Sequence, residues 1–256
     1  MLITTTADPA PHTELRALRL AEELGAKLVA RSNRSLNQLM RTFNDPEIWI
    51  AGERDLRYKK GSDDFMFFHP SMAMIRVKRM LAGEPDTMLE AAGIEEGNSV
   101  MDCTMGLASD AVVFAAGVGE AGQVVALESE RVPYMLAKEG LQTYECGFPL
   151  LEAAMRRVIP INSDHLAYLK EQPDNSADVV YFDPMFRRSA ASSAIEPLRE
   201  LANSAALRRE AIEQAVRVAR KSVVMKEHNR SGEFERLGFR PIHTAQTRIT
   251  YGVIRL

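Results

Sequence analysis

The stretch that decides the fold is Val100-Met101-Asp102-Cys103-Thr104-Met105-Gly106-Leu107-Ala108-Ser109-Asp110. It is an apolar segment that ends in a carboxylate, followed by a glycine and then by a small-residue run from Ala111 to Ala116. This pattern predicts a buried strand, a tight turn and a helix. Gly106 allows unusual dihedrals or the close approach of a ligand, because it has no Cβ. Since open α/β sheets bind ligands at the carboxyl ends of their strands, the turn is the predicted ligand site.

Two common nucleotide-binding motifs are absent from this turn. A dinucleotide site requires Gly-x-Gly-x-x-Gly and a P-loop requires Gly-x-x-x-x-Gly-Lys-Ser/Thr, but the turn contains only Gly106. A second predicted strand, Gln123–Leu127, is followed by Glu128, whose carboxylate can accept hydrogen bonds from both hydroxyls of a ribose. The spacing of Asp102, Gly106 and Glu128 resembles that of class I S-adenosylmethionine-dependent methyltransferases. In the alternative, Asp102 only caps the turn of a Rossmann-like scaffold.

The composition limits the class of protein. A chain of 256 residues with 46% hydrophobic content fits one large domain, or a domain with a small appendage. The net charge of −3 provides no overall basic field for nucleic acid, although a local patch is compatible with it. The two cysteines form neither a disulfide framework nor a metal-binding spacing, and we expect no metal. We expect a cytoplasmic protein, because no signal-peptide pattern or membrane-length apolar run is present.

From Met88 onward, predicted strands and helices alternate regularly, which indicates a parallel sheet. The predicted strands are 99–103, 123–127, 158–161, 177–182, 222–225, 240–246 and 248–255. The last two form a hairpin and place one antiparallel strand in the sheet. We therefore predict an α/β, Rossmann-like class I methyltransferase fold for residues 86–256, with a mostly parallel seven-stranded sheet.

Residues 1–85 are predicted to form a small N-terminal α+β domain. Its predicted helices are 14–30, 35–41 and 71–81, and its predicted strands are 2–6, 48–50, 56–59 and 65–68. Basic residues in this segment alternate with the aromatic residues Phe43, Trp49, Tyr58, Phe65, Phe67 and Phe68. Such a combination suits RNA, since cations bind phosphates and aromatic rings stack on bases. Alternatively, the cations are solvated and the rings form the core of the domain.

The third predicted strand is followed by Asn162-Ser163-Asp164-His165. In methyltransferases, an aspartate at this strand end typically accepts a hydrogen bond from the adenine amino group, and the next backbone N–H reaches a ring nitrogen. Asp164 and His165 occupy these positions. Asp164 can equally cap the helix that follows, and the two roles are compatible. We do not favour His165 as a general base.

The fourth predicted strand is followed by Asp183-Pro184-Met185-Phe186. Amino-methyltransferases carry Asp/Asn-Pro-Pro-Tyr/Phe here, and this chain departs from that pattern at Met185. The reaction needs a hydrogen-bond acceptor that aims the lone pair of an amine nitrogen at the methyl group, and an aromatic face for the target base. Asp183 and the Pro184 carbonyl suit the first role, and Phe186 the second.

Three basic residues near this motif are candidates for substrate binding. Arg187 and Arg188 follow directly and can hold the phosphate of the target nucleotide. Lys226, after the fifth predicted strand, is a phosphate ligand or a solvated cation. The connection from Ser189 to Ser204 is long for a strand-to-helix loop, and such loops are usually functional or mobile.

The segments 102–111, 128–129, 183–186 and 219–226 together resemble the RsmJ-like family, which methylates the N2 amino group of a guanosine in small-subunit (16S) ribosomal RNA. The resemblance extends from Ser99 to about Arg230. It implies S-adenosyl-L-methionine as cofactor and ribosomal RNA or the small ribosomal subunit as partner. The implied cofactor contacts, together with the turn residues, are Asp102, Thr104, Gly106, Ser109, Asp110, Glu128, Ser129, Asp164, His165 and Asp183.

Two other classes of function remain open from the sequence. One is a methyltransferase of the same fold that acts on DNA, protein or a small molecule. The other is a binding module for RNA or a nucleotide that has kept the fold without the activity. The complete set of Asp102, Gly106, Glu128, Asp164 and Asp183 argues against an inactive scaffold, and the Asp183 motif favours a planar amine as acceptor.

Overall fold

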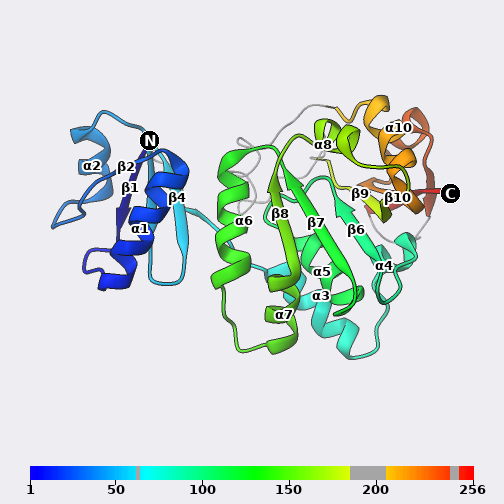
Figure 1. Cartoon of the computed structure of the whole chain (residues 1–256), viewed down its shortest axis with the longest axis horizontal. Coiled ribbons are helices and arrows are strands. Elements are labelled where there is room, and N and C mark those ends of the chain that lie inside the picture. The colour runs from blue at the N-terminus through cyan, green and yellow to red at the C-terminus, as the bar shows by residue number, and fades with distance from the viewer. Residues whose placement is uncertain (62–63, 185–205, 243–247) are drawn as a thin grey trace.

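The computed structural model describes residues 1–61, 64–184, 206–242 and 248–256, which form two sheets with separate cores. The smaller sheet lies at the N-terminal end of the molecule, and helix α6 (Arg131–Thr143) stands between it and the larger sheet (Figure 1). None of the described helices combines the length and the apolar character that crossing a membrane requires.

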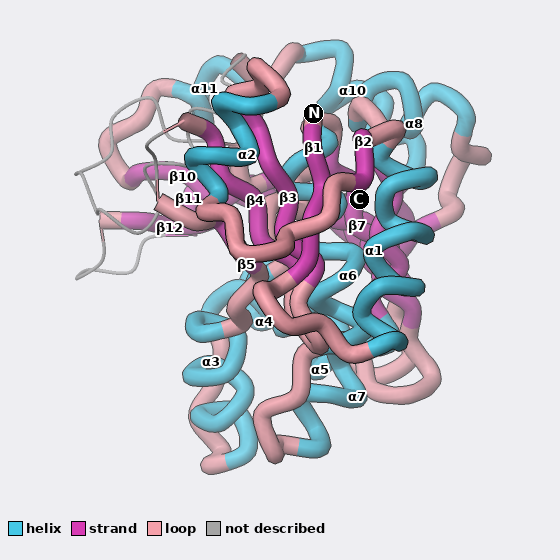
Figure 2. The backbone as a smooth tube through the Cα atoms, turned by 90° about the vertical axis from the view of Figure 1, so that its left-hand side faces the viewer, coloured by secondary structure: helices cyan, strands magenta, loops and turns pink. Residues whose placement is uncertain are grey.

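The N-terminal sheet has the strand order β2-β1-β3-β4-β5. Its elements are β1 (Leu2–Thr5), α1 (Pro11–Leu24), β2 (Lys27–Leu28), α2 (Leu36–Thr42), β3 (Glu47–Ala51), β4 (Leu56–Lys60) and β5 (Met66–Phe67). Figure 2 looks onto this sheet with α1 and α2 beside its strands. One prediction is wrong here: the helix predicted for 14–30 ends at Leu24, because Gly25 adopts φ 57° and closes the helix in the left-handed conformation.

The aromatic residues of this segment divide between core and surface. Trp49 and Tyr58 are paired across β3 and β4 and buried with α1 and α6. On the opposite face, α2 covers Ile48 and Ile50. Phe67, in contrast, is 48% exposed. The interpretation that the aromatic rings form the core of the domain therefore holds for Trp49 and Tyr58 on the central strands. It does not hold for Phe67 on the edge strand.

Helix α3 (Ser71–Leu81) packs with the larger sheet, although its sequence position places it in the predicted N-terminal domain. Its buried residues Ala73 and Val77 share one core cluster with α5. Phe68, just before the helix, also belongs to that cluster and lies against Gly140 of α6. The change from one core to the other thus occurs near Phe68 and not near residue 85.

The larger sheet has the order β11-β12-β10-β9-β6-β7-β8, in which only β12 runs antiparallel to its neighbours among the described strands. Its strands are β6 (Ser99–Asp102), β7 (Gln123–Glu128), β8 (Val158–Asn162), β9 (Ala177–Phe182), β10 (Ala219–His228), β11 (Arg240–Ile242) and β12 (Ile249–Arg255). This arrangement confirms the predicted α/β class and the single antiparallel strand. The turn of the closing hairpin lies outside the described residues.

Helices cover both faces of the larger sheet (Figure 1). One face packs against α3, α4 (Thr87–Ala92), α5 (Ser109–Gly117), α7 (Pro149–Arg157) and part of α6. The other packs against α8 (His165–Glu171), α10 (Arg209–Val218) and α11 (Glu233–Leu237). Two of these helices, α4 and α7, have no counterpart in the prediction. The strands are therefore buried on both sides, as their near-continuous apolar runs require.

Candidate active site

The carboxyl ends of β6, β7, β8 and β9 lie at one edge of the larger sheet, because these strands are parallel and in register. Asp102 ends β6 opposite Tyr181, and Glu128 ends β7 opposite Asn162. The strand-end acids that the sequence singles out are thus gathered at this edge.

The first turn leaves one buried carboxylate oxygen without a partner. Asp102 is 1% exposed. Its Oδ1 accepts a hydrogen bond from the backbone N–H of Thr104 at 3.0 Å, whereas its Oδ2 has no hydrogen-bond partner within the described residues. Burial raises the pKa of Asp102 to about 8. A buried, unpaired acceptor is costly, so a ligand that donates a hydrogen bond or carries a positive charge fits beside it.

Thr104 joins the ends of the first and fourth strands of the sequence pattern. Its hydroxyl accepts a hydrogen bond from the backbone N–H of Asp183 at 2.6 Å and donates one to Oδ1 of Asp102 at 3.4 Å. The side chain therefore holds the Asp183 segment against the first turn, as a structural tie between the two strand ends.

Gly106 and Glu128 form the second part of the site. Gly106 adopts φ 52°, and an added Cβ would meet nothing within 4 Å, so open space lies beside the turn. Its backbone N–H donates to Oε2 of Glu128 at 2.9 Å, while the N–H of Glu130 donates to Oε1 at 2.9 Å. Burial raises the pKa of Glu128. A carboxylate has about four acceptor sites, more than these backbone bonds use, so Glu128 can still accept from a ribose hydroxyl.

The helix that follows begins in a strained conformation. Ala108, which precedes α5, has φ 62°, a left-handed conformation that is uncommon for a residue with a Cβ. Ser109 is half-buried at the first position of α5. The sequence indicates a turn here, but nothing in the residue types marks Ala108 as its left-handed position.

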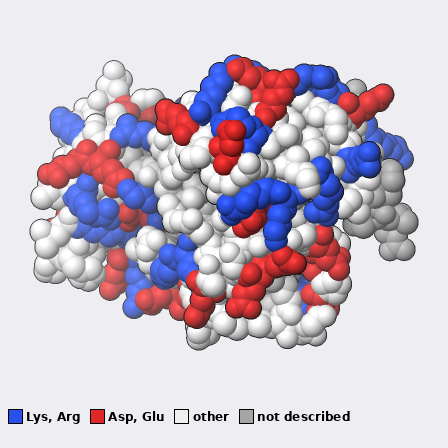
Figure 3. Space-filling view, turned by 45° about the vertical axis from the view of Figure 1, so that its right-hand side comes forward, with Lys and Arg blue, Asp and Glu red and all other residues white. Residues whose placement is uncertain are grey.

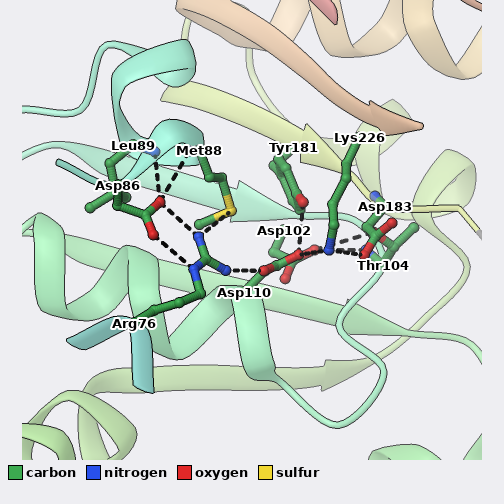
Figure 4. A network of polar contacts seen from close by, with 10 residues as sticks. All are labelled: Arg76, Asp86, Met88, Leu89, Asp102, Thr104, Asp110, Tyr181, Asp183 and Lys226. Atoms are coloured by element: carbon green, nitrogen blue, oxygen red, sulfur yellow. Dashed lines mark hydrogen bonds and ion pairs between the residues drawn. The ribbon is translucent and has the colours of Figure 1, made fainter. Parts of the chain in front are cut away.

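Asp110 is the centre of a buried ionic network (Figure 4). Its Oδ1 accepts from Nη1 of Arg76 at 2.5 Å, and its Oδ2 accepts from the Tyr181 hydroxyl at 2.8 Å and from Nζ of Lys226 at 2.9 Å. Asp110 is a predicted cofactor contact, but both of its carboxylate oxygens bind groups of the protein.

Lys226 lies between two carboxylates. Its Nζ is 2.9 Å from Asp110 and 2.7 Å from Oδ2 of Asp183, and its side chain is 20% exposed. Although burial disfavours the ammonium, the two carboxylates hold the pKa of Lys226 above its ordinary value. The sequence leaves Lys226 as a phosphate ligand or a solvated cation; the described structure gives it internal ion pairs.

The pKa values of the two aspartates that contact Lys226 shift in opposite directions. Burial raises the pKa of Asp183 to about 6; Lys226 opposes this shift, and the neighbouring Asp110 carboxylate adds to it. The pKa of Asp110 is lowered by Lys226 and Arg76 despite its burial. When two neighbouring acids share one cation, their pKa values move apart in this way. Near neutral pH, Asp183 is ionised but close to the range where it takes up a proton.

The end of β8 supplies a further group of polar residues. Asp164 caps α8, since its Oδ1 accepts from the N–H of Ala167 at 3.0 Å. The ring of His165 lies edge-on to Phe182 with centroids 5.7 Å apart, and burial lowers the pKa of His165. Ser129 donates to Glu130 at 3.2 Å. Asn162 donates to the Glu128 carbonyl at 2.7 Å and so ties β8 to β7.

Part of the predicted site lies outside the described residues. Pro184 is the last described residue of its motif. Met185, Phe186, Arg187 and Arg188, with the connection 189–204, belong to the segment that is not described. Their proposed roles rest on sequence alone.

Sequence reasoning missed Arg76, Tyr181 and Asn162. A signal for Arg76 was available, because it stands between the buried residues Ala73 and Val77 of an otherwise apolar helix face. Tyr181 is indistinguishable in sequence from the rest of an apolar strand.

The acceptor groups and the open space at this strand edge fit S-adenosylmethionine, the cofactor that the resemblance implies. Its amino acid end carries an ammonium group, which suits the unpaired Oδ2 of buried Asp102. Its ribose diol suits Glu128, and the space beside Gly106 accepts a close ligand. Among the described residues, no group of three or more His, Cys, Asp or Glu side chains is arranged to hold a metal ion.

Comparisons with known proteins agree with this geometry. A family model described as "Putative SAM-dependent methyltransferase" matches residues 55–248. The Bacillus subtilis protein "Uncharacterized protein YpiP" is 42% identical over 255 residues, which cover 99% of each chain. A "Ribosomal RNA small subunit methyltransferase J" from Mannheimia succiniciproducens is 28% identical over 199 residues, covering 75% of this chain and 76% of that protein.

The fold also has a solved counterpart. The crystal structure of the SAM-dependent methyltransferase NGO1261 from Neisseria gonorrhoeae matches with a TM-score of 0.62 and 16% identity, covering 100% of this chain and 96% of that one. At this identity the similarity establishes the arrangement of strands and helices. The small N-terminal sheet lies within the matched length.

Proposed function

Because the chain belongs to the SAM-dependent methyltransferase family, whose model spans residues 55–248, we propose that it methylates the exocyclic N2 amine of a guanosine in small-subunit ribosomal RNA. The observation that carries the proposal is Asp183: a carboxylate at the end of β9, held beside the cofactor turn by Thr104 and followed by Pro-Met-Phe. The similarity to a ribosomal RNA small subunit methyltransferase supports RNA as the acceptor.

S-adenosylmethionine is the cofactor, and its sulfonium supplies the methyl group. We assign Asp102 Oδ2 to its ammonium and Glu128 to its ribose hydroxyls. Asp164, whose Oδ2 has no hydrogen bond within the described residues, and the backbone of His165 are assigned to the adenine. Ser109 and Ser129 border the same edge of the sheet. Protein groups occupy both oxygens of Asp110, and we assign Asp110 to the support of the site rather than to the cofactor.

Asp183 aligns the acceptor in this proposal. Lys226 donates to Oδ2, and no ammonium, guanidinium, hydroxyl or N–H donor among the described residues contacts Oδ1. Oδ1 can therefore accept from an N–H of the target amine and direct the nitrogen lone pair toward the methyl group. The Pro184 carbonyl accepts from the second N–H. Alignment of this kind supplies much of the rate of an in-line displacement.

The rest of the motif completes the acceptor site. We assign Phe186 to stacking on the target base, with Met185 beside it, and Arg187 and Arg188 to the phosphate of the target nucleotide. These assignments follow from their places directly after Pro184 in the sequence.

RNA contact by the N-terminal sheet rests on a local surface. Figure 3 shows basic side chains interrupted by acidic ones on the face in view, as the net charge of −3 leads one to expect. On β4 and β5, Arg57 lies directly opposite Phe67, and both are exposed. Lys59 is 5.3 Å from the ring centre of Phe65, which is 41% exposed. Exposed rings beside cations suit unstacked bases and phosphates.

The test is incubation with labelled S-adenosylmethionine and small ribosomal subunits from cells that lack this protein, followed by nucleoside analysis. We expect N2-methylguanosine in the RNA. Asp183→Asn retains one acceptor oxygen and should keep part of the single-turnover rate, whereas Asp183→Ala should lose on the order of 100-fold. Asp174→Ala is the control, since Asp174 is 70% exposed and pairs with Arg217. Wild-type rates for Asp183→Ala, or label in ribosomal protein with none in the RNA, would refute the proposal.

A further inference from the structure

The ammonium of Lys226 is fixed from a strand that neighbours the catalytic strand end. Lys226 lies on β10, one position after the Met225–Phe182 pair that joins β10 to β9. Its Nζ contacts Oδ2 of Asp183 at 2.7 Å and Oδ2 of Asp110 at 2.9 Å. The ammonium of Lys226 therefore binds one oxygen of Asp183, Oδ2, and leaves the other to a ligand.

The position of Lys226 depends in turn on Asp110. Arg76 binds the other oxygen of Asp110 at 2.5 Å. Arg76 is itself fixed by two hydrogen bonds to Asp86, at 2.8 and 2.7 Å, and Asp86 caps α4. The charges thus alternate along the line from Asp86 through Arg76, Asp110 and Lys226 to Asp183 (Figure 4). With its partners on both sides anchored, Asp110 has little freedom to follow Lys226 away from the site.

Acidic groups would otherwise dominate the surroundings of Asp183. Among the described residues, the titratable and charged groups that face this cluster come from six elements and the segment before α4: Arg76, Asp86, Asp102, Asp110, Tyr181, Lys226 and Tyr251. Burial and the carboxylate of Asp110 raise the pKa of Tyr251 to about 12. Tyrosine therefore adds no further negative charge near neutral pH, and Lys226 is the cation that contacts Asp183 among the described residues.

We propose that Lys226, anchored by Asp110 and Arg76, is a positioning residue for methyl transfer: it keeps Asp183 ionised and turns Oδ1 toward the acceptor amine. This inference rests on the proposed role of Asp183 as the amine's hydrogen-bond acceptor. It assigns Lys226 to the interior of the site, in place of contact with a substrate phosphate.

The proposal makes two opposite predictions for the pH dependence of the rate. Lys226→Met removes the cation that favours ionised Asp183, and the acid limb of the single-turnover rate should move to higher pH by about 1–3 units. Asp110→Asn removes the carboxylate that raises the pKa of Asp183, and the acid limb should move to lower pH. A role confined to stability predicts no movement in either direction for folded protein.

The matched control is Lys221→Met. Lys221 lies on the same strand and pairs with Glu95 at the surface, at 2.5 Å. The rates of Lys221→Met, Lys226→Met, Asp110→Asn and wild type are measured on the same small subunits across the pH range, with saturating cofactor. Lys226→Met should lose on the order of 100-fold near neutral pH and keep its affinity for S-adenosylmethionine, whereas Lys221→Met should follow wild type.

Lys226→Arg covers the case in which the Met variant does not fold. It retains the positive charge but not the point geometry of an ammonium, so its rate should fall while its acid limb stays in place. Carbon-13 NMR of labelled aspartate carboxyls, with Asp183→Asn assigning the resonance, follows Asp183 without any RNA substrate. Its midpoint should rise in Lys226→Met.

The outcomes separate the two proposals. Wild-type rates for both Asp183→Asn and Asp183→Ala overturn the proposed role of Asp183. If those variants are impaired but the acid limb and the carboxyl midpoint are the same in folded Lys226→Met as in wild type, Lys226 is not a positioning residue.

Discussion

Replacement of Glu128 by alanine tests the cofactor assignment most directly. Glu128 accepts one backbone hydrogen bond on each oxygen, from Gly106 and Glu130, both at 2.9 Å. Because a carboxylate has about four acceptor sites, Glu128 keeps acceptor capacity for the ribose hydroxyls. Loss of these charge-assisted bonds should weaken S-adenosylmethionine binding by about 1–3 kcal/mol, which is about 5- to 150-fold in Kd.

Isothermal titration calorimetry with the cofactor measures this loss, and urea unfolding reports whether the variant is folded. Glu130→Ala is the matched control, because Glu130 lies in the same turn and its side chain accepts only from Ser129 within the described residues. Its Kd should stay within about twofold of wild type, as expected of a substitution outside the binding contacts. Unchanged affinity in folded Glu128→Ala would remove Glu128 from the ribose site.

Three further predictions concern the contacts between the two sheets and the RNA surface. Gly140→Ala places a Cβ 2.0 Å from Cγ of Phe68 and should lower the free energy of unfolding by about 1–3 kcal/mol, whereas Gly232→Ala, with open space, should be nearly neutral in urea. Glu139→Ala removes a buried carboxylate from the partly buried Arg16 and should cost about 3 kcal/mol in the same assay. Phe67→Ala should weaken RNA binding by about 1–3 kcal/mol without changing the cofactor's Kd.

The strand-end acids were predictable because strand periodicity is a local property of the sequence. Each apolar run of four to six residues, such as Ser99–Asp102 and Ala177–Phe182, forms a strand, and the acid that ends or follows it falls at the ligand-binding edge by the geometry of parallel sheets. The order of alternating strands and helices then fixes the fold class.

The predictions that failed concern helix ends and the boundary between the two cores. Gly25 ends α1, whereas the helix predicted for 14–30 continues through this glycine. Asp86 caps α4 and Pro149 begins α7; both are ordinary start signals, and neither helix is among the predicted elements. The boundary between the two cores lies before α3, because Ala73 and Val77 pack on α5. An amphipathic pattern shows which face of a helix is buried but not against which element it packs.

The support of the site was beyond local reasoning for a different physical reason. A lysine after a strand has the same sequence signature whether it meets solvent or a buried carboxylate, and only the depth of the site distinguishes the two. Arg76 and Asp110 lie 34 residues apart on different helices, and their ion pair exists because α3 and α5 pack against each other. Since α3 follows directly after the N-terminal sheet, the packing that joins the two cores also places the guanidinium that holds Asp110, and through it the ammonium that meets Asp183.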